Sequence, residues 1–353
     1  MLDFLIVGNG LAGNVLAFYL RNQNLNYQLI SNSNLSKCSQ IAAGIWNPIV
    51  FKRMTKSWKV DELLPELKQF YTNAEKLLGA NFYTERSILK PFFSEEEKTF
   101  WIKKAKSDLN NYIEAEIKMP DKNLKKFIIP ESYGVVKHSG NIQMSVFLEA
   151  CENFHKKTKS LLQETFDHKE LKITENEVEY KNIKAKNIIF CEGYLVKDNP
   201  FFNWIPLNPV KGETLEISSK EIDLEKDIFN RNGFIFKLDN ELFKVGATYN
   251  WSELNENISE KGLTELKNKL QQMISATYTV IKHEAGVRPS SIDRRPIIGK
   301  HPIHKNIFVF NGLGTKGVMI APYFAKNFVN FYLNKEVLNS EINVERFYSK
   351  YKG

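Results

Sequence analysis

The sequence predicts an α/β protein in which a Rossmann-like nucleotide-binding domain is interleaved with a second domain built on an antiparallel or mixed β-sheet. Three observations carry this prediction. An apolar run meets a glycine-rich turn at the start of the chain, short strands alternate with turns over 212–250, and a buried strand with a second glycine-rich turn occupies 306–317. Separate blocks of these patterns are typical of two domains threaded through one another.

The first element is the stretch FLIVGNGLAGNVLAFYL, residues 4–20, which predicts a strand, a tight turn and a helix. Gly8, Gly10 and Gly13 have the spacing G-x-G-x-x-G. In a dinucleotide site the first glycine allows the turn, the second lets the backbone approach a pyrophosphate, and the third lets helix and strand pack closely. Because glycines also cluster in ordinary turns, a βα turn without a ligand is the alternative.

The remaining elements follow in chain order. The segment from about 55 to 130 is rich in Lys and Glu and predicts solvated helices with one buried face. The other predicted elements are a second strand at 26–31, a helix at 141–157, a buried strand at 187–193, antiparallel strands within 212–250, a strand at 306–312 and a helix after residue 317.

The composition is that of an ordinary globular protein, with 42% hydrophobic and 25% charged residues in 353. A strand that begins by residue 3 leaves no room for a signal peptide, and no apolar run approaches the ~20 residues of a membrane span. We therefore expect a cytoplasmic protein without a membrane span. The net charge of +8 fits a lysine-rich composition at least as well as a nucleic-acid-binding surface.

Cysteines and histidines give no sign of a metal site. Cys38, Cys151 and Cys191 are widely spaced and odd in number, which predicts reduced, mostly buried thiols. The six histidines form no H-E-x-x-H motif. We predict no bound metal.

The end of the predicted second strand departs from the usual dinucleotide pattern. An acidic residue about 20 positions after the glycines normally binds the ribose hydroxyls. Ser31 and Asn32 stand there instead. Both can form hydrogen bonds with a ribose, although a carboxylate would bind it more strongly.

Several separated segments together resemble the FAD-dependent superfamily of D-amino-acid oxidases, glycine oxidases and sarcosine oxidases. They are GNGLAG, SQIAAGIWNP, NIIFCEG, PLNPVKGETLEI, LFKVGATYNW, AGVRPSSIDRRPIIG and NGLGTKGVMIAP. The resemblance implies a D-amino-acid oxidase-like fold and non-covalent FAD, because no covalent attachment residue is apparent. It divides the chain into an FAD-binding domain at 1–50, 135–210 and 283–353, and a substrate domain at 51–134 and 211–282.

The resemblance also assigns cofactor contacts. They comprise the pyrophosphate turn, the ribose end, a small-residue loop under the flavin, an adenine contact, and a loop and helix start whose amides face the flavin C2 carbonyl. In this sequence they are Gly8, Gly10, Leu11, Ala12, Gly13, Ser31, Asn32, Ala42, Ala43, Gly44, Phe166, Gly193, Gly314, Thr315, Lys316, Gly317 and Val318.

Arg288 is the candidate substrate anchor. The resemblance places it over the flavin face, and a guanidinium group can hold a carboxylate with two hydrogen bonds. The alternative is a structural arginine paired with Asp293 or Glu284. The implied reaction is the oxidation of a C–N bond in a small amino acid or secondary amine, in which a hydride passes to flavin N5 and the imine hydrolyses.

The substrate pocket departs from that of glycine oxidases. Where they have a tyrosine hydroxyl beside the carboxylate, this sequence has Phe234, which favours a larger or differently anchored amine. Trp46 and Asn47 are further candidates for the pocket, although core packing explains the tryptophan equally well.

Two other functions stay open from the sequence. NGLGTKG also resembles a turn in oxidases that act on the carboxymethylaminomethyl group of tRNA wobble uridine, for which a basic surface would neutralise phosphates. A flavoprotein subunit without catalytic activity is the second alternative.

Overall fold

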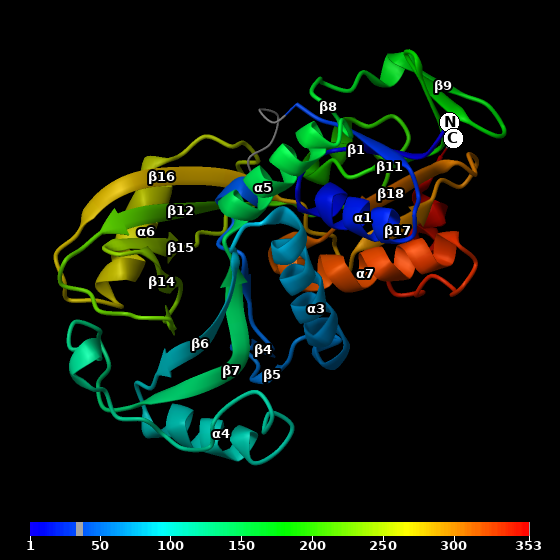
Figure 1. Cartoon of the computed structure of the whole chain (residues 1–353). Coiled ribbons are helices and arrows are strands. Elements are labelled where there is room, and N and C mark those ends of the chain that lie inside the picture. Colours follow the sequence, from blue (N-terminus) through cyan, green and yellow to red (C-terminus); the bar gives the residue numbers. More distant parts are fainter. Residues whose placement is uncertain (33–37, 353) are drawn as a thin grey trace.

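The computed structural model describes residues 1–32 and 38–352 and contains two large β-sheets. The first has the strand order β17-β18-β11-β1-β2-β8, and the second has the order β16-β12-β15-β14-β13-β6-β7-β3. Helices α1, α3 and α7 lie together on one side of the first sheet, and α6 lies against the second sheet (Figure 1). The predicted α/β class with two sheet systems is confirmed.

The first sheet has a parallel centre. Strand β1 (Leu2–Val7) lies between β2 (Tyr27–Ile30) and β11 (Ile183–Phe190) and runs parallel to both. Strand β18 (Ile307–Asn311) is parallel to β11. The outer strands are β8 (Leu161–Leu162), the antiparallel β17 (Ile297–Lys300), and the antiparallel pair β9 (Leu171–Ile173) and β10 (Val178–Tyr180).

Alternation along β1 explains why both faces of this sheet are covered. Phe4 and Ile6 pack into one hydrophobic cluster, whereas Leu5 and Val7 pack into another on the opposite face. Successive side chains of a strand point to opposite faces, so an unbroken apolar run belongs to a strand buried on both. Helices α1 (Leu11–Asn22), α3 (Val60–Leu78), α5 (Met144–Lys157) and α7 (Gly317–Tyr332) supply the cluster that contains Phe4 and Ile6. The opposite face is covered by side chains from loops and 3₁₀ turns, among them Val196, Phe202 and Phe347.

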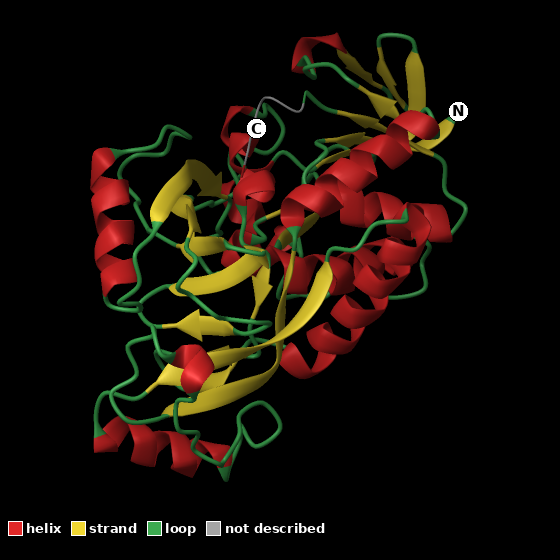
Figure 2. Ribbon diagram, turned by 60° about the vertical axis from the view of Figure 1, so that its left-hand side comes forward, coloured by secondary structure: helices red, strands yellow, loops and turns green. Residues whose placement is uncertain are grey.

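The second sheet is mixed: β13 runs parallel to β6, and the other pairs of neighbouring strands in this sheet are antiparallel. Figure 2 draws the strands of both sheets in yellow and the helices in red. Helix α6 (Glu260–Gln271) packs against β12 and β15. The strands are β3 (Ile45–Trp46), β6 (Tyr83–Pro91), β7 (Tyr133–Ile142), β12 (Val210–Ser218), β13 (Ile228–Asn230), β14 (Phe234–Asp239), β15 (Leu242–Gly246) and β16 (Thr279–Arg288).

The segment 55–130 differs from its prediction. It does hold α3 and α4 (Glu95–Ala105), but the nine-residue strand β6 lies between them. Polar residues along β6, such as Thr84, Glu85 and Arg86, hide its strand character. The smaller elements are α2 (Cys38–Ile41), the pair β4 (Ile49–Val50) and β5 (Thr55–Lys56), and short 3₁₀ turns.

The predicted domain limits at residues 135 and 283 fall inside β7 and β16, two strands of the second sheet. The division of the chain into two domains stays a prediction. Within residues 1–32 and 38–352, no helix combines the length and the apolar character needed to cross a membrane.

Candidate active site

The predicted cofactor turns meet at one edge of the first sheet. Gly8 follows β1, Gly193 lies three residues after the end of β11, and Gly314 follows β18. Because these three strands are parallel, their carboxyl ends share that edge. Ligands of open α/β sheets bind in the crevice outside this edge. Turns that are far apart in the sequence are therefore neighbours.

Close packing explains the first glycine turn. Gly8 has a φ of +113°, and a Cβ there would lie 2.5 Å from the Cys191 carbonyl oxygen. Gly13 lies in the first turns of α1, where a Cβ would come within 1.9 Å of the Gly8 carbonyl oxygen. A larger side chain at either position would push helix and strand apart, so the turn is built for close approach.

The start of α1 is left available to a ligand. Across the described residues, no side chain caps this helix at Gly10, although the Leu11 N–H donates to Ser39 Oγ at 3.2 Å. The side-chain carbonyl oxygens of Asn9 and Asn14 are buried and, within the same residues, accept no hydrogen bond. Free amides and the positive end of the helix dipole are what a pyrophosphate requires. Ala12 lies in the same turn.

The predicted adenosine end lies beside β8. The Ser31 N–H donates to the Leu162 carbonyl at 3.1 Å, and Asn32 Nδ2 donates to Thr165 Oγ1 at 3.0 Å. Phe166 stacks on Tyr180 with ring centroids 4.4 Å apart. Ser31, Asn32 and Phe166 therefore come from two neighbouring chain segments that leave the first sheet together.

The small-residue loop connects the two sheets. The Gly44 carbonyl accepts the Ile142 N–H at 3.0 Å, which ties the loop to the end of β7. Ala42 is exposed and Ala43 is half-buried. The short helix α2 (Cys38–Ile41) precedes this loop and packs on β16, where Gly286 leaves room for the Cys38 backbone.

The second glycine loop joins the cofactor edge to the end of β16. Asn311 Nδ2 donates to the Gly193 carbonyl at 2.8 Å, and the Gly314 N–H donates to the Pro289 carbonyl at 3.2 Å. Pro289 directly follows Arg288, so this contact places the predicted substrate anchor next to the predicted flavin loop. Helix α7 begins at Gly317, and the residues the structure describes supply no side-chain cap there. Thr315 is exposed and Val318 is buried.

Lys316 is a half-buried cation at this helix start. Its ammonium group donates to Ser57 Oγ and lies 3.5 Å from the Asn47 carbonyl oxygen. It forms no ion pair with any described carboxylate. Burial lowers the pKa of Lys316 to about 8. The lysine thus contributes a partly neutralised positive charge to the loop that the resemblance places at the flavin.

Arg288 lies flat on the second sheet. A Cβ at Gly212 would come within 2.0 Å of its guanidinium group, so the group lies directly over this glycine. One of its N–H groups donates to the Thr248 carbonyl at 3.2 Å. Among the described carboxylates none pairs with Arg288, because Asp293 pairs with Arg346 and Glu284 pairs with lysines. The remaining donors are available for a substrate carboxylate.

Phe234 lies on the same face of the second sheet as Arg288. Its ring covers Gly246, and a Cβ at Gly246 would also meet the Thr214 methyl group at 3.0 Å. Thr214 stands two residues beyond Gly212 on β12, so it lies between the arginine and the phenylalanine. Its hydroxyl oxygen is buried and, within the described chain, has no hydrogen-bond partner.

The other two predicted pocket residues hold the neighbouring loop. Trp46 is 2% exposed, stacks on Tyr83 and donates from Nε1 to the His138 carbonyl at 3.1 Å. Asn47 uses its side-chain oxygen to accept the Ile49 N–H at 2.9 Å. Both contacts are those of structural residues, and a role in the pocket stays a prediction.

Three features of the site were not predicted from the sequence. They are the free hydroxyl of Thr214, the aromatic residues Tyr249 and Trp251 beside Arg288, and the buried charges of Lys211 and Glu213 beneath them. Two aromatic residues within the polar stretch TYNWSELN were the only available signal. Within residues 1–32 and 38–352, no cluster of His, Cys, Asp and Glu could hold a metal ion.

Comparison with known proteins identifies the class. A family model described as FAD dependent oxidoreductase matches residues 3–330, and the chain therefore belongs to that family. It is 26% identical to the glycine oxidase of Bacillus subtilis (strain 168), with 95% of this chain and 94% of that protein covered. It is 23% identical to the glycine oxidase of Bacillus licheniformis, with 91% and 90% covered.

Solved structures of the same fold include the glycine oxidase of Bacillus cereus ATCC 14579, with a TM-score of 0.76, 18% identity and 96% of each chain covered. The L-amino acid deaminase of Proteus vulgaris gives a TM-score of 0.77 at 15% identity, with 98% of this chain and 97% of that chain covered. The protein is an FAD-dependent oxidoreductase with this fold.

The residues present fit FAD. The uncapped start of α1 and the turn at Gly8 and Gly13 suit a pyrophosphate, and Ser31 and Asn32 can bind a ribose without an acidic residue. The uncapped start of α7 suits negative charge on the flavin ring. The individual cofactor contacts stay predictions.

Proposed function

We propose that this protein oxidises the C–N bond of an amino acid or secondary amine that carries a carboxylate, with Arg288 as the carboxylate anchor. The observation that carries the proposal is the position of Arg288. Its guanidinium group lies on Gly212, next to the glycine loop at Gly314, and pairs with no described carboxylate. The related glycine oxidases support the same class of substrate.

The chain's own residues would bind and orient the substrate. Arg288 would fix the carboxylate through the guanidinium donors that its bond to the Thr248 carbonyl leaves free. Bound FAD supplies a two-electron acceptor for the hydride released from the carbon next to nitrogen. Loss of the hydride would turn the C–N single bond into a C=N iminium, which gives its N–H proton to water as the imine forms. Water would then convert the imine to a carbonyl compound and ammonia or an amine. Orientation of a neutral amine is the main requirement of such a step.

The thiol of Cys38, which is close enough to Arg288 for that charge to act on its pKa, does not serve as a base in this proposal. Burial raises the pKa of Cys38 to about 11, although the positive charge of Arg288 lowers it slightly. The thiol therefore stays protonated at neutral pH. The proposal needs no cysteine or histidine beside the reacting carbon.

Anaerobic titration of the purified holoprotein tests the proposal. Glycine, sarcosine, iminodiacetate, D-proline and other D- and L-amino acids would be added while the flavin absorbance is recorded. At least one carboxylated amine is expected to bleach the flavin bands. Arg288→Ala should raise the substrate concentration needed for half-maximal reduction at least 100-fold, since a buried charge-assisted pair is lost.

Arg288→Lys keeps the positive charge but loses the planar guanidinium group. Its substrate concentration for half-maximal flavin reduction should therefore lie between those of the wild type and Arg288→Ala. The control is Arg21→Ala, which changes an arginine at the far end of α1. Bleaching that is unchanged in Arg288→Ala would contradict the anchor. A holoprotein that none of the amines reduces would contradict the proposed reaction.

A tRNA-borne amine stays an alternative prediction. The net charge of +8 would be its electrostatic basis. Binding to tRNA that weakens steeply between 50 and 200 mM salt would support it, and binding that is absent at low salt would exclude it.

A further inference from the structure

Two large aromatic side chains stand exposed beside Arg288. Tyr249 is 50% exposed and Trp251 is 58% exposed. Their rings stack with centroids 6.1 Å apart and planes at 26°. The guanidinium carbon of Arg288 lies 4.7 Å from the centre of the Tyr249 ring. The pair therefore offers uncovered aromatic surface directly next to the proposed carboxylate anchor.

The backbone of Tyr249 is fixed by β12. The preceding Thr248 N–H donates to the Glu213 carbonyl at 3.1 Å. The following Asn250 exchanges two backbone hydrogen bonds with Lys211, at 2.9 and 3.0 Å. The position of the tyrosine ring thus follows from the sheet and does not depend on a free loop.

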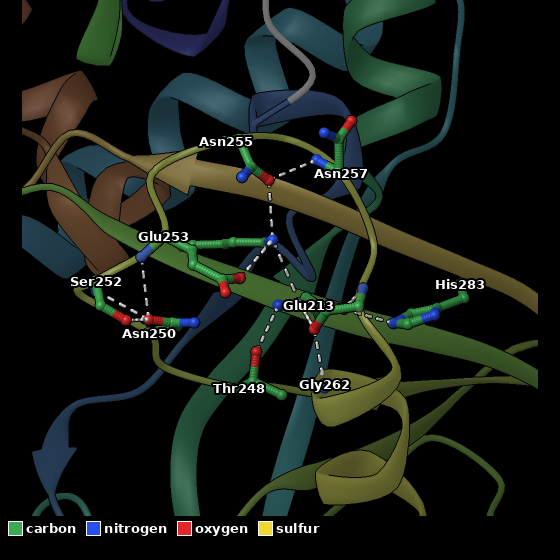
Figure 3. Close-up of polar contacts among 11 residues, drawn as sticks. Glu213, Thr248, Asn250, Ser252, Glu253, Asn255, Asn257, Gly262 and His283 are labelled. Atoms are coloured by element: carbon green, nitrogen blue, oxygen red, sulfur yellow. Dashed lines mark hydrogen bonds and ion pairs between the residues drawn. The ribbon is translucent and has the colours of Figure 1, made fainter.

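Buried charges fix the loop that carries Trp251 (Figure 3). Lys211 is 1% exposed, and its ammonium group donates to Asn255 Oδ1 at 3.0 Å. Glu213 is 2% exposed and accepts the Ser259 hydroxyl at 2.7 Å and the Ser259 N–H at 3.1 Å. A buried lysine and glutamate are costly unless their hydrogen bonds are satisfied. Here both charges are used to hold 250–259 in one conformation.

A short hydrogen-bonded turn completes the loop. Asn250 Oδ1 accepts the Ser252 N–H at 2.9 Å and the Ser252 hydroxyl at 2.8 Å. This turn encloses Trp251 between two fixed residues. An exposed tryptophan on a fixed loop is pre-organised to stack on a ligand, because little further ordering is needed.

We propose, on the basis of the proposed function, that Tyr249 and Trp251 form the side-chain wall of the substrate site. The preferred substrate is then a carboxylated amine that bears a planar aromatic group on its nitrogen or its α-carbon. The carboxylate binds the free edge of Arg288, and the aromatic group covers the exposed rings. A substrate the size of glycine would leave both rings in water, and Phe234 would give its carboxylate no hydroxyl. An aromatic contact of this kind strengthens binding about tenfold.

Matched pairs of ligands test this inference on the holoprotein. Anaerobic flavin reduction would compare N-benzylglycine with sarcosine, and phenylalanine with alanine in both enantiomers. Binding without turnover would be measured from flavin difference spectra with phenylacetate and acetate. The aromatic member of each pair is expected to bind at least tenfold more tightly.

Trp251→Ala should reduce that preference to about threefold or less without changing the affinity for acetate, because Trp251 does not contact Arg288 in the described contacts. Tyr249→Leu should reduce it as well. The control is Phe100→Ala, which removes another exposed aromatic side chain, on α4, and should leave the preference intact.

The outcomes separate the two proposals. Equal affinity for aromatic and aliphatic ligands, together with flavin reduction by the small amines, would overturn the aromatic wall and leave the proposed function standing. Failure of every carboxylated amine to bind or reduce the flavin would overturn both. A Trp251→Ala protein that changes its oligomeric state but keeps the aromatic preference would assign the pair to self-association and overturn the inference.

Discussion

The glycine-rich edge of the first sheet, the proposed cofactor end, and the Arg288 end of the second sheet, the proposed substrate end, meet where the Gly314 N–H donates to the Pro289 carbonyl, but different forces shape them. At the first, the close approach of backbone segments decides the geometry. A Cβ at Gly13, for example, would lie 1.9 Å from the Gly8 carbonyl oxygen. At the second, the buried charges of Lys211 and Glu213 hold the loop next to the anchor. The cofactor end is thus fixed by the absence of side chains, and the substrate end by their interactions.

This difference explains how each end can vary. A glycine turn accepts almost no substitution, because the backbone fills the space where a Cβ would stand. A loop held by side chains can present other residues without changing its anchors, so Tyr249 and Trp251 can differ while Lys211 and Glu213 stay. The substrate can change in such a scaffold while the cofactor stays the same.

The largest expected effect is a loss of folding stability at the substrate end. Glu213→Ala removes the acceptor of Ser259 and leaves Lys211 buried beside fewer partners. We expect the free energy of unfolding to fall by about 3–5 kcal/mol, measured by thermal and urea denaturation. The control is Glu253→Ala, whose exposed carboxylate lies 3.9 Å from the same ammonium group and should matter by less than about 1 kcal/mol. Equal losses in both variants would refute the buried anchor.

The second effect is a loss of stability and of bound flavin at the cofactor end. Gly13→Ala places a methyl group 1.9 Å from the Gly8 carbonyl oxygen, so α1 must shift away from β1. We expect a loss of about 2–3 kcal/mol and a protein purified with little flavin. Gly79→Ala is the control, since nothing lies within 4 Å there and only its φ of +66° is unfavourable. That variant should lose about 1 kcal/mol and keep its flavin. Full flavin content in Gly13→Ala would contradict the close-approach argument.

The third expected effect is a dependence of folding stability on pH that comes from one buried histidine. Burial of His155 behind α1 lowers its pKa to about 4 from an ordinary value of 6.5. Between these two pH values the unfolded chain takes up a proton that the folded protein does not bind, so stability falls as the pH falls. The contribution is at most about 1.4 kcal/mol per pH unit. His155→Gln should reduce this slope, and the same change at the exposed His138 should not. Parallel pH profiles for wild type and His155→Gln would show that His155 is not responsible.

The smallest effect sharpens the substrate end. Phe234→Tyr adds a hydroxyl on the face of the sheet that carries Arg288. If that hydroxyl reaches a bound carboxylate, glycine should bind about tenfold more tightly, as measured from flavin difference spectra. An unchanged affinity would mean that the substrate carboxylate lies away from this ring.

Local sequence patterns were enough for the secondary structure around the first glycine turn. The strand, turn and helix at 4–20 form as predicted, and the antiparallel strands at 212–250 are present. Both depend on residues near one another in the chain. The strand β6 was missed because its polar residues are satisfied by distant segments. Arg86, for example, bonds to Asn141 and to the carbonyls of Lys226 and Lys237, contacts that no local pattern records.

The substrate end depended on long-range contacts. Arg288 was predicted through the resemblance of its motif to a known family, but its position over Gly212 depends on the pairing of β12 with β16. The free hydroxyl of Thr214 follows only from the packing of Phe234 over Gly246. Residues of this kind become recognisable once the register of the sheet is known.

A crystal structure of the holoprotein with phenylacetate, an unreactive carboxylate, tests the central claim most directly. The account predicts FAD with its pyrophosphate at the start of α1 and its flavin ring at the start of α7. The carboxylate should lie ~2.7–2.9 Å from the guanidinium nitrogens of Arg288, which is the length of a charge-assisted hydrogen bond. A cofactor bound elsewhere, or a carboxylate that leaves Arg288 unpaired, would contradict the account.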